Sequence, residues 1–284
     1  MRLSLITAVR NAAATLPAAL ASVRCQRCAG FELEHLILDG ASTDGTLALA
    51  EAHARAGAGG GAIRVRSQPD RGFYDALNQG IALATGEVVG ILNADDYFPR
   101  EDVLEQVCAA LACPGAPPCL YGDLLYVRAP RPSALERQAD GGWWLAGAAP
   151  YRQWRSGPFR PARFYQGWMP PHPAVFLRRD LFRTLGGYRL DLGTAADYEL
   201  LLRFLLKNAV PAQYLPRTLV HMRAGGMSGG GLRRRLAVHR LDRQAWSVNG
   251  LRPAPWTLAC KIVRKLPQFI LPCRGRFSNP GSSI

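Results

Sequence analysis

The fold is decided by the stretch 67–96, which reads SQPDRGFYDALNQGIALATGEVVGILNADD. Within it, Asp75–Thr85 carries apolar side chains at helical spacing, and Gly86 marks the end of that helix. Apolar and β-branched residues follow over Glu87–Leu92, which predicts a buried strand that ends in the acidic turn 93–96. A helix that leads into a buried strand is the repeating unit of a parallel sheet, so this stretch predicts an α/β fold.

The residues before this stretch repeat the same alternation. We predict strands at Leu3–Ala8, His35–Asp39 and Ile63–Ser67, and helices at Ala12–Val23 and Leu47–Arg55. Strands separated by helices predict a mostly parallel, Rossmann-like sheet flanked by helices. In such sheets ligands bind at the carboxyl ends of the strands, so the polar residues after each apolar run are candidates for a site.

The second half of the chain is less regular. Between Pro114 and Pro171 one strand is expected at Leu120–Val127, and we interpret the rest of this proline-rich stretch as a loop-rich insertion. Beyond it we predict strands at Ala174–Arg178 and Gln213–His221, and helices at Arg179–Leu185 and about Ala195–Lys207. These elements are too interrupted to form a core alone, so they are expected to pack on the same sheet.

The composition limits the class of protein. With 284 residues and 48% hydrophobic content the chain can form a real core, which argues against a disordered or fibrous protein. Its apolar runs are far shorter than the roughly 20 residues that span a bilayer, and no secretion signal is visible. The seven cysteines are scattered, and Cys25-x-x-Cys28 has no second pair, so neither a disulfide framework nor a zinc site is expected. A cytoplasmic protein is the simplest interpretation.

The positive charge is concentrated at the end of the sequence. Lys and Arg number 35 against 21 Asp and Glu, a formal net charge of +14, and residues 251–284 contain no acidic residue. Over 255–273, apolar and basic residues alternate as in an amphipathic helix, with Pro267 as an interruption. We therefore predict a peripheral anchor, outside the catalytic fold, that lies on an anionic membrane surface at the inner membrane face. A helix packed on the protein is the alternative.

The acidic pair Asp95 and Asp96 is the first candidate site. The loop after the first strand, Ala8–Ala12, has no glycine, which disfavours NAD or FAD binding, and no phosphate-binding Gly-Lys-Ser/Thr occurs. Adjacent carboxylates repel each other, and a hard divalent cation relieves the repulsion while it bridges to phosphate oxygens. The pair therefore predicts a site for Mg²⁺ or Mn²⁺ with a diphosphate, and a plain turn is the alternative.

Four segments together carry a family resemblance. They are the stretch 67–96 quoted above, SLITAVRNAAATL (4–16), LILDGASTDGT (36–46) and TAADYELLLR (194–203). In order and spacing they resemble the family 2 inverting glycosyltransferases of the GT-A fold, most of all the branch that builds bacterial exopolysaccharide, colanic acid and O-antigen repeat units. The resemblance covers roughly residues 1–225 and implies a nucleotide-sugar-binding half (1–112) and an acceptor-side half of the same domain (113–250). The charge pattern adds a basic amphipathic tail (251–284).

The resemblance also implies roles for residues at the strand ends. The nucleotide base and ribose are expected against Thr7, Val9 and Asp39, with Asp44 nearby, and the donor sugar and diphosphate against Asp75 and Asn78. A carboxylate accepts hydrogen bonds from N–H and O–H groups, which suits Asp39 to this role, and a turn before Gly40 is its alternative role. Asp96 matches the direct metal ligand of the family, and Asp95 the residue beside the ribose.

Further residues correspond to the catalytic base and to a closing loop. Asp197 matches the base, although a carboxylate that only stabilises the helix dipole is the alternative. His172 lies where relatives carry a Pro-x-His-Gln-like segment, but Pro173 follows it here, so its contacts stay open. His221 and Arg223 are expected to close over the diphosphate as a flexible flap, because guanidinium binds phosphate in a bidentate manner.

The reaction implied is the inverting transfer of a hexose-type sugar, from a UDP-sugar before other nucleoside-diphosphate sugars. The acceptor is a hydroxyl of a growing or polyprenyl-linked bacterial surface glycan. A nucleotidyltransferase is an alternative, but it is expected to carry a Gly-rich basic loop after the first strand. A basic nucleic-acid-binding protein is another, although no nucleic-acid-binding motif is present, and we expect no nucleic acid partner.

Overall fold

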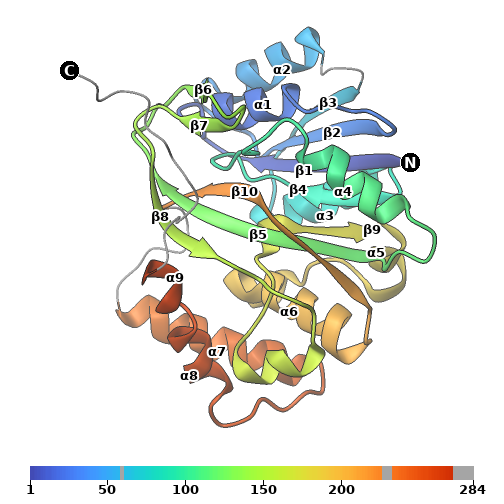
Figure 1. Cartoon of the computed structure of the whole chain (residues 1–284), viewed down its shortest axis with the longest axis vertical. Helices are drawn as coiled ribbons and strands as arrows, with labels where there is room; N and C mark the ends of the chain where they lie inside the picture. Colours follow the sequence, from blue (N-terminus) through green and yellow to red (C-terminus); the bar gives the residue numbers. More distant parts are fainter. Residues whose placement is uncertain (58–60, 226–231, 271–284) are drawn as a thin grey trace.

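The structure, a computed structural model, describes residues 1–57, 61–225 and 232–270 (Figure 1). The strands are β1 (Arg2–Val9), β2 (Glu32–Asp39), β3 (Ala62–Ser67), β4 (Val88–Ile91), β5 (Cys119–Arg128), β6 (Leu135–Arg137), β7 (Trp143–Leu145), β8 (Ala149–Trp154), β9 (Val175–Arg178) and β10 (Ala212–Arg223). The α-helices are α1 (Leu16–Arg24), α2 (Thr46–Ala56), α3 (Phe73–Leu83), α4 (Val103–Ala112), α5 (Asp180–Leu185), α6 (Ala196–Leu201), α7 (Leu232–Val248), α8 (Thr257–Val263) and α9 (Pro267–Ile270). Three short 3-10 helices, η1 (Pro161–Gln166), η2 (His172–Ala174) and η3 (Leu190–Ala195), and one π-helical segment, η4 (Leu202–Lys207), complete the elements.

One mixed sheet runs through the molecule in the strand order β10-β5-β9-β4-β1-β2-β3. Strands β4, β1, β2 and β3 pair in parallel, as the sequence predicts. Strand β9 is antiparallel to both of its neighbours, β4 and β5, and joins this parallel half to β5 and β10, which are parallel to each other. The α/β fold with a mostly parallel sheet is therefore confirmed.

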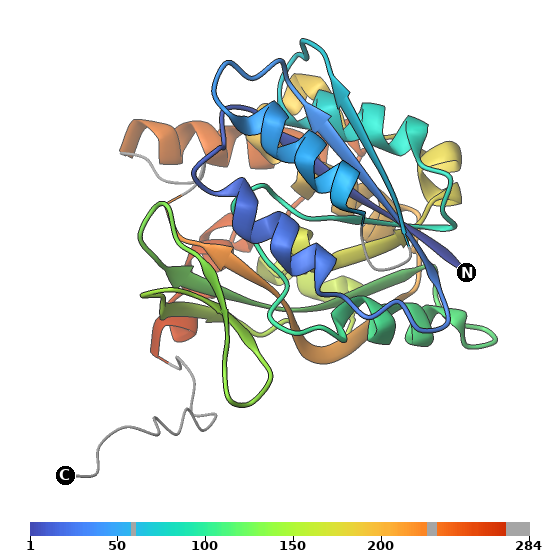
Figure 2. The ribbon, with the colours of Figure 1, turned by 90° about the horizontal axis from the view of Figure 1, so that it is seen from above.

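Helices cover both faces of the sheet. Helices α1, α2 and α4 pack on one face through clusters that include Leu5, Leu20 and Val107. The other face carries α3, α5 and α6, which bury Leu77, Phe182 and other side chains against the strands. Figures 1 and 2 show α1 and α2 side by side next to β1–β3. Because helices cover both faces, the ends of the strands are the part of the sheet where polar side chains can form a site.

The predicted loop-rich insertion contains more regular structure than expected. Its expected strand is β5, and β8 pairs with β5 in antiparallel fashion. The hairpin β6–β7 packs its Leu145 with Tyr97, next to the acidic pair. The insertion therefore also lies against the strand end that carries the acidic pair.

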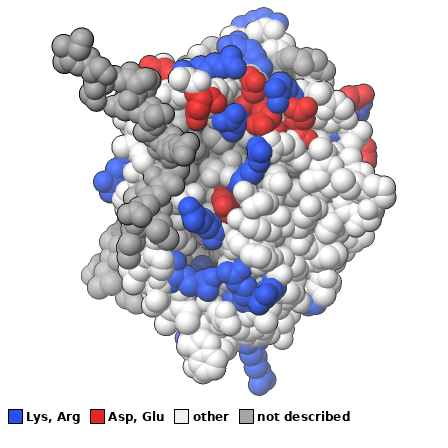
Figure 3. All heavy atoms as spheres, in the orientation of Figure 1, with Lys and Arg blue, Asp and Glu red and all other residues white. Residues whose placement is uncertain are grey.

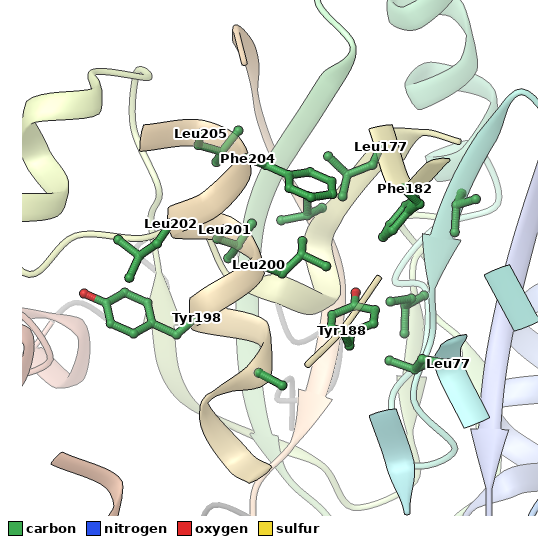
Figure 4. Packing of buried hydrophobic residues seen from close by; sticks show 14 of the residues in the cluster. Leu77, Leu177, Phe182, Tyr188, Tyr198, Leu200, Leu201, Leu202, Phe204 and Leu205 are labelled. Carbon is green, nitrogen blue, oxygen red and sulfur yellow. The ribbon is translucent and has the colours of Figure 1, made fainter. Parts of the chain in front are cut away.

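Helix α6 and the following π-helical turn form the second layer of the core. Leu200, Phe204 and Leu205 point into the cluster that also holds Phe182 (Figure 4). Tyr198 projects from the other side of α6, and the indole Nε1 of Trp246 on α7 donates a hydrogen bond to its hydroxyl at 2.9 Å. Helix α6 is therefore held from both sides.

A buried ion pair ties this helix to the preceding loop. The Arg203 guanidinium donates to both carboxylate oxygens of Glu199 at 2.8 and 2.9 Å and to the carbonyls of Gly186 and Gly187. The Glu199 side chain is 1% exposed. Glu199 therefore serves to hold the loop before α6 in place through Arg203.

Arg203→Met is expected to lower the free energy of unfolding by about 3–5 kcal/mol, because it leaves the Glu199 carboxylate buried without its cation. Urea denaturation measures the loss. Arg183→Met is the matched control, since Arg183 pairs with Asp180 on the surface and its loss is expected to cost less than about 1 kcal/mol. Equal losses in the two variants would contradict the assignment.

The segment after residue 250 differs in part from the prediction. It does break at Pro267, where α9 begins, but α8 is part of the fold and does not lie outside it. The Thr257 hydroxyl donates to the carbonyl of Tyr165 at 2.6 Å, and Lys261 pairs with the buried Asp242 at 2.8 Å. Residues 271–284 of the predicted anchor lie outside the described residues. Within the described ranges, no helix combines the length and the apolar character needed to cross a bilayer.

Candidate active site

The acidic pair lies at the carboxyl end of β4, as predicted. Asp96 is fully buried; it accepts a hydrogen bond from the Asn93 amide at 2.7 Å and one from the Arg223 backbone N–H at 3.2 Å. Asp95 is the more accessible carboxylate, and Arg131 lies 3.9 Å from it. Burial raises the pKa of both carboxyl groups, and the charge of Asp95 raises the pKa of Asp96 further. A bound cation would therefore stabilise the ionised form of both carboxyl groups.

The donor set of this pair is compatible with Mg²⁺ or Mn²⁺. Carboxylate oxygens are the ligands that these hard cations prefer, and each oxygen of Asp96 retains a lone pair beside its hydrogen bond. Among the described residues, no group of three or more His, Cys, Asp and Glu side chains could hold an ion. A cation at Asp95 and Asp96 would therefore need oxygens from a ligand, as diphosphate supplies.

Arg223 places an unpaired guanidinium edge beside the acidic pair. The residue is 1% exposed, and its Nη1 donates to the carbonyls of Ala129 and Pro130. Its buried Nε and Nη2 have no hydrogen-bond partner among the residues that the structure describes. Burial lowers the pKa of this guanidinium, and the nearby charge of Arg131 adds to the effect. Two free N–H groups next to two carboxylates can bind the oxygens of a phosphate.

The expected flap is not what the structure shows. His221 and Arg223 both lie inside strand β10, where the backbone of His221 pairs with that of Tyr97. The His221 Nδ1 contacts the Tyr97 hydroxyl at 3.2 Å, and burial lowers the pKa of the imidazole to about 3. His221 is thus a neutral structural residue, and only Arg223 keeps a place in the site. The glycine-rich stretch from 226 to 231 lies outside the described residues.

The residues expected around the nucleotide lie at adjoining strand ends, since Val9 pairs with Asp39 in the sheet register. Asp39 accepts from the hydroxyls of Ser42 and Ser67, so it also serves the turn. Thr7 differs from the expectation, because its side chain is turned inward and its Oγ1 pairs with His35 Nε2 at 3.0 Å. Asp44 joins the loop after β1 to the loop after β2.

The contacts of Asp44 explain that role. Its carboxylate accepts from the backbone N–H of Ala13 at 3.1 Å and of Thr46 at 2.9 Å. Hydrogen bonding from the Thr46 hydroxyl lowers the pKa of this carboxyl group. Asp44 therefore positions the strand-end loops, and a direct contact with the donor stays a prediction.

Helix α3 was expected to present Asp75 and Asn78 to the donor. Asp75 accepts from the Arg71 backbone N–H and from Arg71 Nη2, both at 3.1 Å. The Asn78 amide is used differently, since it donates to the carbonyl of Tyr188 at 2.9 Å and accepts from the N–H of Tyr188 at 2.8 Å. Asn78 therefore fixes the Tyr188 loop, because both ends of its amide are already paired.

Asp197 lies in the first turn of α6, half-buried, as the sequence predicts. The charge of Asp197 acts on several nearby side chains, among them Tyr74, Tyr188 and His172. Burial and the charge of Asp197 raise the pKa of Tyr74 and of Tyr188. Burial lowers the pKa of His172, and Asp197 opposes that effect. The His172 Nε2 contacts the Tyr188 hydroxyl at 2.6 Å, so these groups form one buried network behind the carboxylate.

The sequence interpretation missed Tyr74, Tyr188 and Arg131. Tyr74 precedes Asp75 within the quoted stretch, so its place on α3 was a signal that could have included it. Tyr188 meets Tyr74 at a ring-centroid distance of 5.3 Å although the two are far apart in the sequence. Arg131 is one of many arginines in the insertion, and nothing in its spacing distinguishes it.

Comparisons with known proteins show the family of the chain. The family model for glycosyl transferase family 2 matches residues 4–141. A PGL/p-HBAD biosynthesis glycosyltransferase of Mycobacterium tuberculosis is 32% identical over 212 residues, which cover 75% of this chain and 73% of that protein. An uncharacterized glycosyltransferase of the same organism is 34% identical over 210 residues, which cover 72% of this chain and 68% of that protein.

Solved structures share the fold at low sequence identity. S. aureus TarS 1–349 in complex with UDP-GlcNAc has a TM-score of 0.62 at 18% identity, and the match covers 93% of this chain and 72% of that one. The mannosyltransferase PcManGT from Pyrobaculum calidifontis, in complex with GDP-Man and Mn²⁺, has a TM-score of 0.59 at 20% identity, covering 92% and 73%. These neighbours confirm the GT-A fold. The family match and the curated relatives together show that this chain belongs to glycosyl transferase family 2 and is a glycosyltransferase.

Proposed function

We propose that the chain transfers a sugar from a nucleoside-diphosphate donor, UDP-sugar before GDP- or dTDP-sugar, to an acceptor hydroxyl with inversion. The observation that carries the proposal is the position of Tyr126 on β5. Burial raises the pKa of Tyr126, and the charges of both Asp96 and Asp197 act on it. The proposed diphosphate site and the proposed base therefore both lie near this one side chain.

On the donor side, the free edge of Arg223 and the cation of Arg131 face the leaving diphosphate. They neutralise the charge that develops as the bond from C1 to the diphosphate oxygen breaks, and the electron pair leaves with that oxygen. Asp96, with Asp95 beside it, would hold Mg²⁺ or Mn²⁺. Such a cation supplies the same kind of charge neutralisation when it is bound.

On the acceptor side, Asp197 accepts the proton of the attacking hydroxyl as its oxygen bonds to C1. The carboxylate stands on a helix whose opposite side is packed, so its position is fixed before the acceptor arrives. Tyr74 and the His172–Tyr188 pair restrict it further. No covalent enzyme intermediate is required.

A thermal-shift panel of UDP-, GDP- and dTDP-sugars with Mn²⁺ tests this proposal, because a ligand that binds only the folded state raises Tm. We expect the UDP-sugars to give the largest shift, and no shift with any of them would contradict the proposal. Turnover assays then need two acceptor classes. One is the lipid-linked surface glycan implied by the family resemblance, and the other is the kind of compound named by the PGL/p-HBAD biosynthesis relatives.

We also propose that the enzyme works on an anionic membrane surface, through a C-terminal apolar face made of Trp256, Ile262, Val263, Leu266 and Phe269. Among the described residues these are the large hydrophobic side chains that are exposed, by 41% to 59%. A pocket of about 370 Å³ adjoins them, lined by His239, Arg240, Arg243 and apolar residues of α8. On the face drawn in Figure 3, Lys and Arg without Asp or Glu mark the helical end of the molecule. Apolar side chains ringed by cations suit a lipid interface.

The double variant Val263→Ser and Leu266→Ser is expected to weaken binding to phosphatidylglycerol-containing vesicles at least about tenfold, because two exposed apolar side chains lose their burial in lipid. Vesicle sedimentation at low salt measures the change, with pure phosphatidylcholine vesicles as the control for charge. Point substitutions are preferable to truncation at Gly250, which would leave Asp242 buried without Lys261. Unchanged sedimentation of the double variant would refute the membrane face.

A further inference from the structure

An arginine on β8 is enclosed by aromatic rings. The guanidinium carbon of Arg152 lies 3.9 Å from the ring centroid of Tyr126, 5.5 Å from that of Trp154 and 5.7 Å from that of Phe269. The residue is only 8% exposed. Aromatic faces attract a cation, but they leave its N–H groups without acceptors in the ring planes.

The charge of Arg152 has no carboxylate partner. Its Nε is buried and makes no hydrogen bond, and among residues 1–57, 61–225 and 232–270 no ion pair to it is found within 4.0 Å. The stretches outside these ranges contain no Asp or Glu in the sequence. A buried cation without a counter-ion is costly unless a ligand supplies the negative charge.

The neighbours of Arg152 indicate what kind of anionic ligand would neutralise its charge. Tyr126, the ring it contacts most closely, is the residue on which the charges of both Asp96 and Asp197 act. Phe269, which also lies near the guanidinium, belongs to the C-terminal apolar face and packs on Tyr151 at 5.3 Å. Arg152 therefore contacts both a residue near the proposed reaction centre and a residue of the surface proposed to meet the membrane.

We propose that Arg152 binds the phosphate of a lipid-linked acceptor, while Trp154 and Phe269 contact the start of its apolar chain. This inference rests on the proposed function, since it names the class of acceptor for that site. The donor diphosphate is not the occupant, because Arg223 and Arg131 already stand at the acidic pair that marks the donor site. The binding group is one anion at the head of a hydrophobic chain.

Decyl phosphate, below its micelle concentration, is the probe, and decanol is its uncharged match. Calorimetry without any donor is expected to show tighter binding of decyl phosphate than of decanol to the full-length enzyme. Arg152→Gln is expected to weaken decyl phosphate binding about tenfold to a hundredfold, the usual worth of hydrogen bonds to a charged group. Arg128→Gln is the matched control, because Arg128 is exposed and stacks on Tyr151 one strand away. It should stay within about twofold of wild type.

Two further measurements separate the alternatives. Arg152→Lys keeps the charge and is expected to retain part of the affinity, which covers the case in which Arg152→Gln folds poorly. Binding of UDP with Mn²⁺ should be the same in wild type and in all variants. Equal decyl phosphate affinity in wild type and Arg152→Gln would overturn the inference, and so would a parallel loss of UDP binding. Because the probe is measured without donor, a failure of the proposed transfer reaction would appear only in turnover.

Discussion

Asp96→Ala is expected to abolish metal-dependent binding of the nucleoside diphosphate, with an affinity loss of more than about a hundredfold. Even outer partners of metal ligands are worth 10–100-fold in affinity, so a direct ligand is expected to contribute more. The effect is large because the protein offers only the carboxylates of Asp95 and Asp96 at this strand end, and the remaining ligands must come from the diphosphate. Calorimetric titration of UDP with Mn²⁺ measures it.

The stability of the same variant provides the control. The Asp96 carboxyl has a raised pKa in the folded protein. Its contribution to folding stability is therefore fully present at a pH below the pKa that it has in the unfolded chain. That contribution is lost as the pH rises through the pKa of Asp96 in the folded protein. At neutral pH without metal, Asp96→Ala should therefore melt no lower than wild type apart from its lost hydrogen bonds. Unchanged UDP affinity in the presence of Mn²⁺ would refute the role of Asp96.

Asp197→Asn is expected to lower turnover by about 10²–10⁴-fold and to leave donor binding nearly unchanged. This is the usual contribution of a positioned general base, and the amide retains the size of the carboxylate but cannot accept the proton. Steady-state kinetics with a saturating donor and a suitable acceptor measure the effect, and calorimetry with UDP and Mn²⁺ checks the donor site.

Asp191→Asn is the companion variant for Asp197→Asn. Asp191 lies in η3, just before α6, and pairs with Arg189 on the surface, so its loss should leave turnover unchanged. Near-normal turnover of Asp197→Asn would rule out its role as the base. A fall in both variants would indicate that the segment, and not the carboxylate, matters.

The parallel half of the sheet was predictable because each of its strands is a short apolar run followed by polar residues. Helix α4 carried a comparable signal, with Leu104, Val107 and Leu111 on one buried face, and the interpretation overlooked it. Helix α7 offered less. It buries Ala245 and Trp246 among many arginines, so its sequence alone resembles a solvated charged segment. Packing on α6, and not hydrophobic periodicity, accounts for its place in the fold.

The site was predictable where it depended on strand ends and not where it depended on packing between distant segments. Asp95, Asp96 and Asp197 could be selected from local sequence, because each follows a recognisable element. The pairing of Asn78 with the Tyr188 backbone depends on how α3 meets the loop before η3, and local spacing contains no trace of it. The same reason explains why Thr7 turned out to face His35 and not the site.

The strand order has a consequence for how this enzyme can move. The proposed metal site follows β4, and the half proposed to bind the acceptor continues from β4 through β9 to β5 in one hydrogen-bonded sheet. Such a sheet offers no hinge about which the donor and acceptor halves could rotate apart during the catalytic cycle. The sheet therefore fixes the strand end that carries the acidic pair relative to the strands on which α6, with the proposed base Asp197, packs. Substrate entry, product release and the order in which donor and acceptor bind must be governed by the loops at the strand ends.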